Sequence, residues 1–225
     1  MNRSAALTAA SNTGRAEAAY ERLKSDIVAG QYRPGQRLIE LDLAPRLGVS
    51  RATLRAAFQR LAQDGLVDLE RNRGARVRAV SLGQALQIMR LREVLAGLSA
   101  NLAAGVASDA ELDQLEGAVD RMEQALAARD HDAYATHSAW FHERIVALAR
   151  NPYLASVMAS LSYPLVRLQF GRSFSGRTAS QATAEMRAIL DRLRARDADG
   201  AERAMRRYLA KVRRAMERGA GKESH

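Results

Sequence analysis

The sequence predicts a mainly α-helical protein, with an N-terminal winged helix-turn-helix followed by a bundle of six helices. Three observations support this fold class. Helical spacing of apolar residues runs through most of the chain, two short alternating segments lie on either side of a turn near residue 72, and nothing of strand type follows residue 80. The order helix, helix, short turn, helix, hairpin is that of a winged helix-turn-helix.

Three helices are expected before residue 65, because apolar residues recur every three or four positions and turn residues separate the runs. Ser50 is a natural N-cap for the third helix, since its hydroxyl can accept a hydrogen bond from a backbone N–H of the first turn. Pro45 lies inside the second helix, where it forfeits one backbone hydrogen bond unless that helix starts late. The expected helices cover residues 16–29, 40–47 and 51–63.

The third helix has two different faces. Leu54, Ala57, Phe58 and Leu61 form the stripe expected to face the core. Its opposite face carries three polar residues four positions apart, namely Arg51, Arg55 and Gln59. Two short strands, at 65–69 and 75–78, are then joined by the turn 71–74.

From about residue 81 only long helices are expected, and each break between them contains cap or turn residues. A bundle of this length can bury a core of its own. The helices are expected at 82–106, 109–129, 131–150, 152–171, 178–196 and 198–218. The expected domain organisation is a disordered leader at 1–14, a winged helix-turn-helix domain at 15–80, an all-helical domain at 81–218 and a tail at 219–225.

The charge and composition narrow the functional classes. The chain has a net charge of +10, and residues 1–80 carry 14 basic and 8 acidic side chains, a net of +6. Such an excess suits nucleic acid or another acidic partner. The sequence has no cysteine, which excludes disulfides and thiolate metal sites. No apolar run is long enough for a membrane helix, and the first residues lack the apolar core of a secretory signal, so we expect a cytoplasmic protein with no membrane partner.

Residues 20–77 resemble the DNA-binding domain of GntR-family transcription regulators. The resemblance rests on Pro34-Gly35 with Leu38, on the stretch from Leu43 to Arg51, on Arg55, on Leu61 with Gly65-Leu66-Val67, and on Gly74 in the wing. The helices that follow resemble the FCD effector domain of the FadR subfamily. Arg92, the segment FHERI at 141–145 followed by Asn151, and EMRAIL at 185–190 carry this second resemblance.

The resemblance implies double-stranded operator DNA as a partner. Arg51 and Arg55, at the start of the third helix, would each present a guanidinium to guanine in the major groove, whereas the alternative is that both are simply solvated. Ser50 and Thr53 would face phosphate oxygens. Arg73 at the wing tip would reach the minor groove or a phosphate, and Gly74 would allow close approach of the backbone. Thr53 and Ala56 depart from the usual Pro and Glu of the family, but neither change removes a basic contact.

FCD domains commonly hold a divalent metal through one Asp and three His. The matching positions in this chain are Ser138, His142, Met186 and Tyr208. One imidazole without a carboxylate or a second histidine cannot complete a divalent site. We therefore expect no metal and no other cofactor.

Without a metal, a carboxylate ligand must be held by arginine or by neutral donors. A small organic acid or aromatic acid is the expected effector. Each position has a structural alternative: Met186 and Tyr208 as core residues, His142 as a buried hydrogen-bonded histidine, and Arg92 paired with Glu93 or Glu143. The expected ligand-binding residues are Arg92, Tyr134, Ser138, His142, Arg167, Met186 and Tyr208.

These expectations favour a homodimeric DNA-binding transcription regulator, of which a repressor is the more usual kind in the family. Its operator affinity would be controlled by the effector bound in the helical domain. A ligand-independent DNA-binding regulator with a decayed pocket is the alternative. An enzyme is not expected, because the chain shows no Gly-rich phosphate loop, no nucleophile–base pair and no complete metal set.

Overall fold

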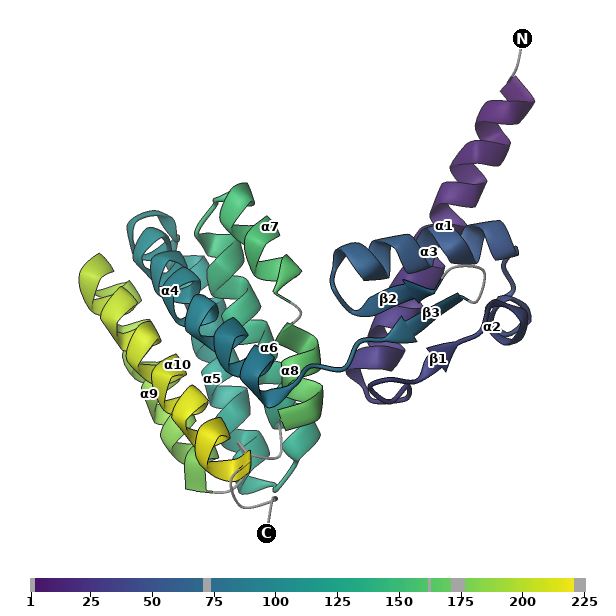
Figure 1. Cartoon of the computed structure of the whole chain (residues 1–225). Helices are drawn as coiled ribbons and strands as arrows, with labels where there is room; N and C mark the ends of the chain where they lie inside the picture. Colours follow the sequence, from purple (N-terminus) through teal and green to yellow (C-terminus); the bar gives the residue numbers. More distant parts are fainter. Residues whose placement is uncertain (1–2, 71–73, 162, 171–176, 221–225) are drawn as a thin grey trace. The chain divides into compact units, whose positions relative to one another are not determined.

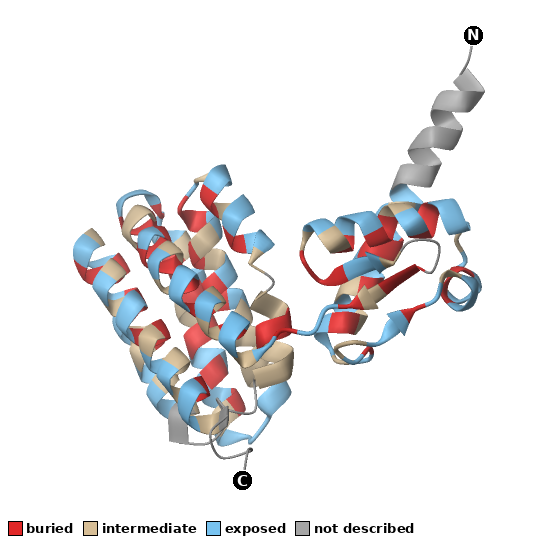
Figure 2. Cartoon of the chain, viewed as in Figure 1, coloured by how far each residue is buried: buried red, intermediate tan, exposed pale blue. Residues whose placement is uncertain are grey.

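The computed structural model describes residues 3–70, 74–161, 163–170 and 177–220 (Figure 1). These residues form two compact units. The first unit contains residues 1–81 together with 159–169, and the second contains residues 82–158 and 170–225. Each unit has a core of its own, and in each the buried residues lie mainly on the faces that the helices turn toward one another (Figure 2).

The first unit is a winged helix-turn-helix, as expected. Its helices are α1 (Arg3–Val28), α2 (Glu40–Leu47) and α3 (Arg51–Gln63). Helices α1 and α3 pack against each other through fully buried apolar side chains, including the stripe expected on α3. Gly48 ends α2 in the left-handed conformation with φ 64°, and its N–H and that of Val49 are bonded to carbonyls of α2.

A small antiparallel sheet completes this unit, with strands in the order β1-β3-β2. Strands β2 (Val67–Glu70) and β3 (Gly74–Val77) form the expected hairpin. The residues after the turn at Gly35 form a third strand, β1 (Arg37–Leu38), which pairs with β3. This additional pairing ties the turn after α1 to the wing.

The second unit consists of helices that pack side by side (Figure 1). Helix α10 (Ala198–Ala220) lies along α4 (Leu82–Val106), and α5 (Asp109–Ala127) packs against both α6 (His131–Leu148) and α9 (Arg177–Arg194). Helix α5 begins at a capping box, in which Ser108 accepts from the N–H of Glu111 and the Glu111 carboxylate accepts from the N–H of Ser108.

Several expected bounds of helices differ from those in the structure. Helix α1 begins at Arg3 instead of residue 16, and the four alanines between these positions have high helix propensity, while the expected domain bounds stay a prediction. The helix expected over 152–171 is two helices, α7 (Pro152–Ser160) and α8 (Tyr163–Phe170). Pro164 explains this break, because proline fits the first turn of a helix but not its interior. Helix α10 extends two residues into the expected tail, of which residues 221–225 lie outside the described part.

Candidate functional site

The start of α3 is held by a side-chain cap. The Ser50 hydroxyl accepts a hydrogen bond from the Thr53 N–H at 3.1 Å and lies 2.8 Å from the Thr53 hydroxyl. Thr53 is only 3% exposed and lies beside the Ser50 cap, and its expected contact with a phosphate stays a prediction. Ser50 itself is exposed at the positive end of the helix dipole, where anions bind favourably.

Arg51, Arg55 and Gln59 are exposed along one face of α3, opposite its buried stripe. The Arg55 Nε donates to both carboxylate oxygens of Glu40, at 2.8 and 3.0 Å. This hydrogen bond raises the pKa of Arg55 above its usual value. Glu40 is the first residue of α2, so the ion pair links the two helices and holds the Arg55 guanidinium at the surface. Sequence reasoning missed this partner because it lies 15 residues away.

The wing is described only in part. Arg73 lies outside the described residues, so its expected DNA contact stays a prediction. Gly74 has φ 94°, and a Cβ built there would lie 2.3 Å from the Leu38 carbonyl oxygen. The close approach that Gly74 permits in the structure is therefore between strands β3 and β1.

A polar network holds α1 against the end of α3. The Tyr20 hydroxyl donates to Asp64 at 2.5 Å, and the Lys24 ammonium donates to both Tyr20 and Asp64. Burial, together with the Asp64 hydrogen bond, raises the pKa of Tyr20. The Arg60 guanidinium lies 4.2 Å from the centre of the Tyr20 ring and pairs with Glu17. These contacts fix α3, and with it the positions of Arg51 and Arg55.

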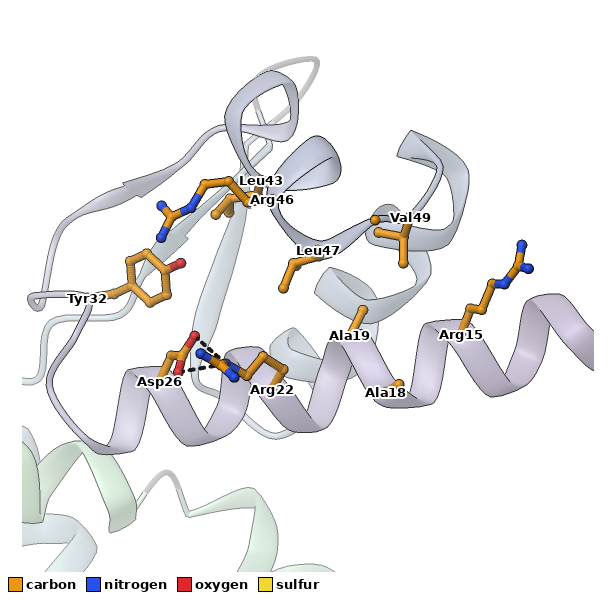
Figure 3. Close-up of a pocket in the computed structure, with 11 residues that line it drawn as sticks. Arg15, Ala18, Ala19, Arg22, Asp26, Tyr32, Leu43, Arg46, Leu47 and Val49 are labelled. Atoms are coloured by element: carbon orange, nitrogen blue, oxygen red, sulfur yellow. Dashed lines mark hydrogen bonds and ion pairs between the residues drawn. The ribbon is translucent and has the colours of Figure 1, made fainter.

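A cleft of about 410 Å³ lies between α1 and α2 (Figure 3). Arg15 and Arg22 lie on its α1 side and Arg46 on its α2 side, while Leu43 and Val49 supply apolar walls. Arg22 is paired with Asp26 within the cleft. No sequence pattern predicted this cleft, because its walls come from two helices joined by a turn.

In the second unit, two of the expected ligand-binding side chains lie against each other. The rings of His142 and Tyr208 are stacked with centres 5.3 Å apart, and the His142 Nε2 lies 3.4 Å from the Tyr208 hydroxyl. Both residues are buried, as is Met186. Arg92 is also buried, and Glu93, one of the acids considered as its partner, is held by Arg213 at 2.6 Å.

The other expected ligand-binding residues are Tyr134, Ser138 and Arg167, and no contact of theirs with the stacked rings is described. The Tyr134 hydroxyl donates to the Ala179 carbonyl at 3.1 Å and accepts from Thr183 at 3.4 Å, and burial raises the pKa of Tyr134. Ser138 is half-buried on α6, one turn before His142. Arg167 lies in α8 of the first unit, and its convergence with Arg92 stays a prediction.

A second cleft, of about 440 Å³, lies between α5 and α9, and Thr183 and Arg187 are among its lining residues. Arg187 spans this cleft, because its guanidinium pairs with Asp120 and Glu123 of α5 at 2.8 and 2.9 Å. The expected ligand-binding residues do not line this cleft.

The donor set around His142 does not fit the metal that FCD domains commonly hold. Among the described residues, no group of three or more His, Cys, Asp or Glu side chains could hold a metal ion. The neighbour of the imidazole is a phenol, which is a poor ligand for a divalent ion at neutral pH. Across the same residues, no helix is both long and apolar enough to cross a membrane.

Comparison with protein families gives two matches. The family described as "Bacterial regulatory proteins, gntR family" matches residues 15–77, and the FCD domain matches residues 87–211. Each match falls on one of the regions in which the sequence showed the corresponding resemblance.

Comparisons with individual proteins agree. The chain is 26% identical to a probable D-xylose utilization operon transcriptional repressor of Paenarthrobacter nicotinovorans, over 82% of this chain and 81% of that protein. It is 26% identical to the transcriptional repressor RspR of Escherichia coli, over 86% and 85%. Among solved structures, Escherichia coli McbR/YncC has a TM-score of 0.78 at 20% identity, covering 92% of this chain and 98% of that one. A structure described as that of "a putative transcriptional regulator GntR from Rhodococcus sp. RHA1" has a TM-score of 0.73 at 27% identity, covering 91% of this chain and 98% of that one.

Proposed function

Because the chain belongs to the GntR family of bacterial regulatory proteins and carries an FCD domain, we propose that it is a homodimeric repressor controlled by a small ligand. That the chain is a DNA-binding transcriptional regulator and not an enzyme follows from the family itself. The observation that carries the proposal is the exposed arginine face of α3, which begins at a capped and exposed helix start.

In the proposed complex, α3 enters the major groove with its first turns nearest the bases. Arg51 and Arg55 each read a guanine through two hydrogen bonds, while Ser50 and the α3 start bind backbone phosphate. Arg55 must then exchange its Glu40 carboxylate for the base. Glu40 thus keeps Arg55 extended before DNA binds. It also competes with DNA for the Arg55 guanidinium, so it lowers the affinity for sequences that lack a well-placed guanine.

The test is a gel shift on the operator of this protein with three variants. Arg55→Ala should lower operator affinity roughly tenfold to a hundredfold, because one bidentate guanine contact is lost. Arg22→Ala removes an equally exposed arginine that pairs on α1, away from α3, and should leave the affinity within about twofold. Glu40→Gln should narrow the difference in affinity between operator and random DNA, because Arg55 without its carboxylate partner can contact any sequence more freely. Equal operator binding by wild type and Arg55→Ala would overturn the assignment.

We propose that the ligand of the second unit is a small organic or aromatic acid. Arg92, Tyr134, His142 and Tyr208 supply the donors, Met186 supplies an apolar wall, and Ser138 and Arg167 complete the set in the ligand-bound form. The stacked His142 and Tyr208 support an aromatic body, because a planar ligand could extend or displace this stack. Ligand binding would shift the dimer between forms with different operator affinity.

The contact between His142 and Tyr208 also favours the second candidate, a ligand-independent regulator, because these two side chains already satisfy each other. Thermal unfolding in the presence of organic and aromatic acids separates the two. A ligand at a hundred times its Kd should raise the unfolding free energy by about 2.7 kcal/mol. Loss of this shift in Arg92→Met, with the shift kept in Arg22→Met, would support the ligand-controlled form. No shift with any acid would leave the ligand-independent regulator.

The proposed function implies where the protein acts and in which oligomeric state. Bacterial operator DNA lies in the cytoplasm, so the protein acts there. Two recognition helices related by a two-fold axis would read the two halves of a palindromic operator, so the active form is a dimer.

A further inference from the structure

The cleft between α1 and α2 has no part in the function proposed above, yet its lining is rich in positive charge (Figure 3). Three arginines line it, namely Arg15, Arg22 and Arg46. They share the cleft with one acid, Asp26, so its described lining carries a net charge of +2. Its volume of about 410 Å³ falls within the range of small-molecule sites, which is about 300–1,000 Å³. The cleft thus has the size and the sign of charge to hold a small anion.

The arginines of the cleft have nitrogen donors to spare. Arg15 and Arg46 are exposed, and among the described residues neither forms an ion pair or a side-chain hydrogen bond. Arg22 is held by Asp26 through its Nε alone, at 3.1 and 3.2 Å from the two carboxylate oxygens. Asp26 therefore orients the Arg22 guanidinium and leaves its two terminal nitrogens for another acceptor.

Tyr32 adds a hydroxyl donor at one end of the cleft. The residue is 8% exposed, so its ring is fixed by the core of the first unit. Figure 3 shows the hydroxyl facing into the cleft near Arg46 and the Arg22–Asp26 pair, whereas Arg15 lies at the other end. Within the described part of the chain, this hydroxyl has no hydrogen-bond partner. A buried phenol usually has one, so an acceptor atom of a ligand fits here.

The nearby end of α2 does little to oppose an anion. Carbonyl groups at the C-terminal end of a helix carry partial negative charge. The Ala44 carbonyl, however, accepts from the Val49 N–H at 3.0 Å. The Pro45 carbonyl likewise accepts from the Gly48 N–H at 3.2 Å, so these hydrogen bonds offset part of that charge.

Donors that come from three segments of the chain suit a tetrahedral anion. A planar carboxylate can be satisfied by the fork of a single arginine, whereas a phosphate monoester offers three terminal oxygens and a charge near −2. Arg22 of α1, Arg46 of α2 and Tyr32 of the turn after α1 can each donate to a different oxygen. The apolar part of the lining, which would take the body of the ligand, includes Ala19, Leu47 and Val49.

From these observations, we propose that the cleft is a second ligand site, which takes the phosphate group of a small organic phosphate. The phosphate lies against Arg22, Arg46 and Tyr32, and the body of the ligand extends toward Arg15. A ligand held in this way joins α1 to α2 and stabilises the first unit. The inference goes beyond the proposed function, which places its effector in the second unit.

Calorimetric titration of the full chain without DNA tests the proposal, with inorganic phosphate and phenyl phosphate as the probes. Arg46→Gln should raise the Kd of both probes roughly tenfold to a hundredfold, and Tyr32→Phe roughly tenfold, because each removes a hydrogen bond to a charged group. Arg78→Gln is the matched control, since Arg78 is 47% exposed and outside the cleft, and its Kd should stay within about twofold of the wild type. Circular dichroism verifies that the variants are folded. Absence of binding by the folded wild type, or equal binding by wild type and Arg46→Gln, would overturn the proposal.

Hydrogen exchange with phenyl phosphate locates the site. Exchange should slow in peptides from 15–32 and 40–49, relative to peptides from α5 and α6. Because phenyl phosphate is also an aromatic anion, Arg92→Met serves as the control for the second unit and should bind it like the wild type. Loss of binding in Arg92→Met, with binding kept in Arg46→Gln, would place the phosphate in the second unit and contradict the proposal.

These outcomes are separate from those of the proposed function, because the titrations contain no DNA. Arg46→Gln should leave operator affinity within about twofold. If Arg46→Gln lowers operator affinity and the wild type binds neither probe, Arg46 contacts the DNA backbone, so the second ligand site fails and the regulator assignment stands. If the wild type binds no DNA sequence selectively, the proposed function fails whatever the cleft binds.

Discussion

Replacement of Gly74 by alanine should destabilise the first unit without removing any DNA-contacting side chain. The alanine would have to adopt φ 94°, and its Cβ would lie 2.3 Å from the Leu38 carbonyl oxygen. An L-residue held in the left-handed region costs about 1–2 kcal/mol. Moving the Leu38 carbonyl disturbs the two-residue pairing of β1 with β3, and each backbone hydrogen bond lost costs about 0.5–1.5 kcal/mol. If two such bonds are lost, the total is about 2–5 kcal/mol, a large share of a typical stability of about 5–15 kcal/mol.

Hydrogen exchange of the full chain, followed by mass spectrometry, locates this effect. Peptides that contain β1 and β3 should exchange faster in Gly74→Ala, whereas those from α5 and α6 should not change. Gly117→Ala is the matched control, because its Cβ would meet only the end of the Arg121 side chain, at 3.5 Å. Alanine inside a helix is better than glycine by about 0.5–1 kcal/mol, so this variant should be at least as stable as the wild type.

The outcome also bears on DNA binding. Because the wing continues directly from Gly74, operator affinity should fall together with the protection of β1 and β3. Wild-type exchange rates in these strands of Gly74→Ala would refute the reasoning, since they would mean that the close approach of β3 to β1 is unnecessary.

Two other changes probe the second unit. The hydrogen bond from the Ser108 N–H lowers the pKa of Glu111, so the folded protein binds a proton at this carboxylate less readily than the unfolded protein does. The resulting stabilisation is present at neutral pH and is lost as pH falls through the lowered pKa. Glu111→Gln should therefore lower Tm at pH 7 and flatten its decline below about pH 4.5, measured by circular dichroism. Tyr208→Ala should lower the unfolding free energy by about 3–5 kcal/mol, because a buried ring stacked on His142 is lost, whereas Tyr208→Phe should cost about 1 kcal/mol. Urea unfolding followed by the fluorescence of Trp140, the single tryptophan, measures both, and equal losses in the two variants would contradict the stacking argument.

The elements with strong local signals could be predicted from the sequence. Ser50 and the apolar stripe from Leu54 to Leu61 located α3, because caps and periodicity act over a few residues. The break before Pro164 was missed, since the apolar pattern continues across it. The helical start of α1 was missed for a different reason, because residues before Ala16 show no apolar stripe and the run 11–14 consists of Ser, Asn, Thr and Gly, which have lower helix propensity.

The candidate site was predictable in its residue types but not in its pairings. Arg55 was expected at the surface of α3, whereas its partner Glu40 could not be inferred, because the pair depends on how α2 crosses α3. His142 and Tyr208 are 66 residues apart, and only the family resemblance placed them at one site. The same resemblance implied a phosphate contact for Thr53, which stays a prediction, whereas its burial beside the Ser50 cap could not be read from the motif.

Selection of DNA from a random duplex pool by the purified full-length protein tests the central claim most directly. We predict enrichment of an inverted repeat, whose half-sites each contain a guanine needed for binding, and loss of this enrichment in the double variant Arg51→Ala/Arg55→Ala. A pool that stays random with the folded wild-type protein, or the same repeat enriched by the double variant, would contradict the account of α3 as the helix that reads DNA.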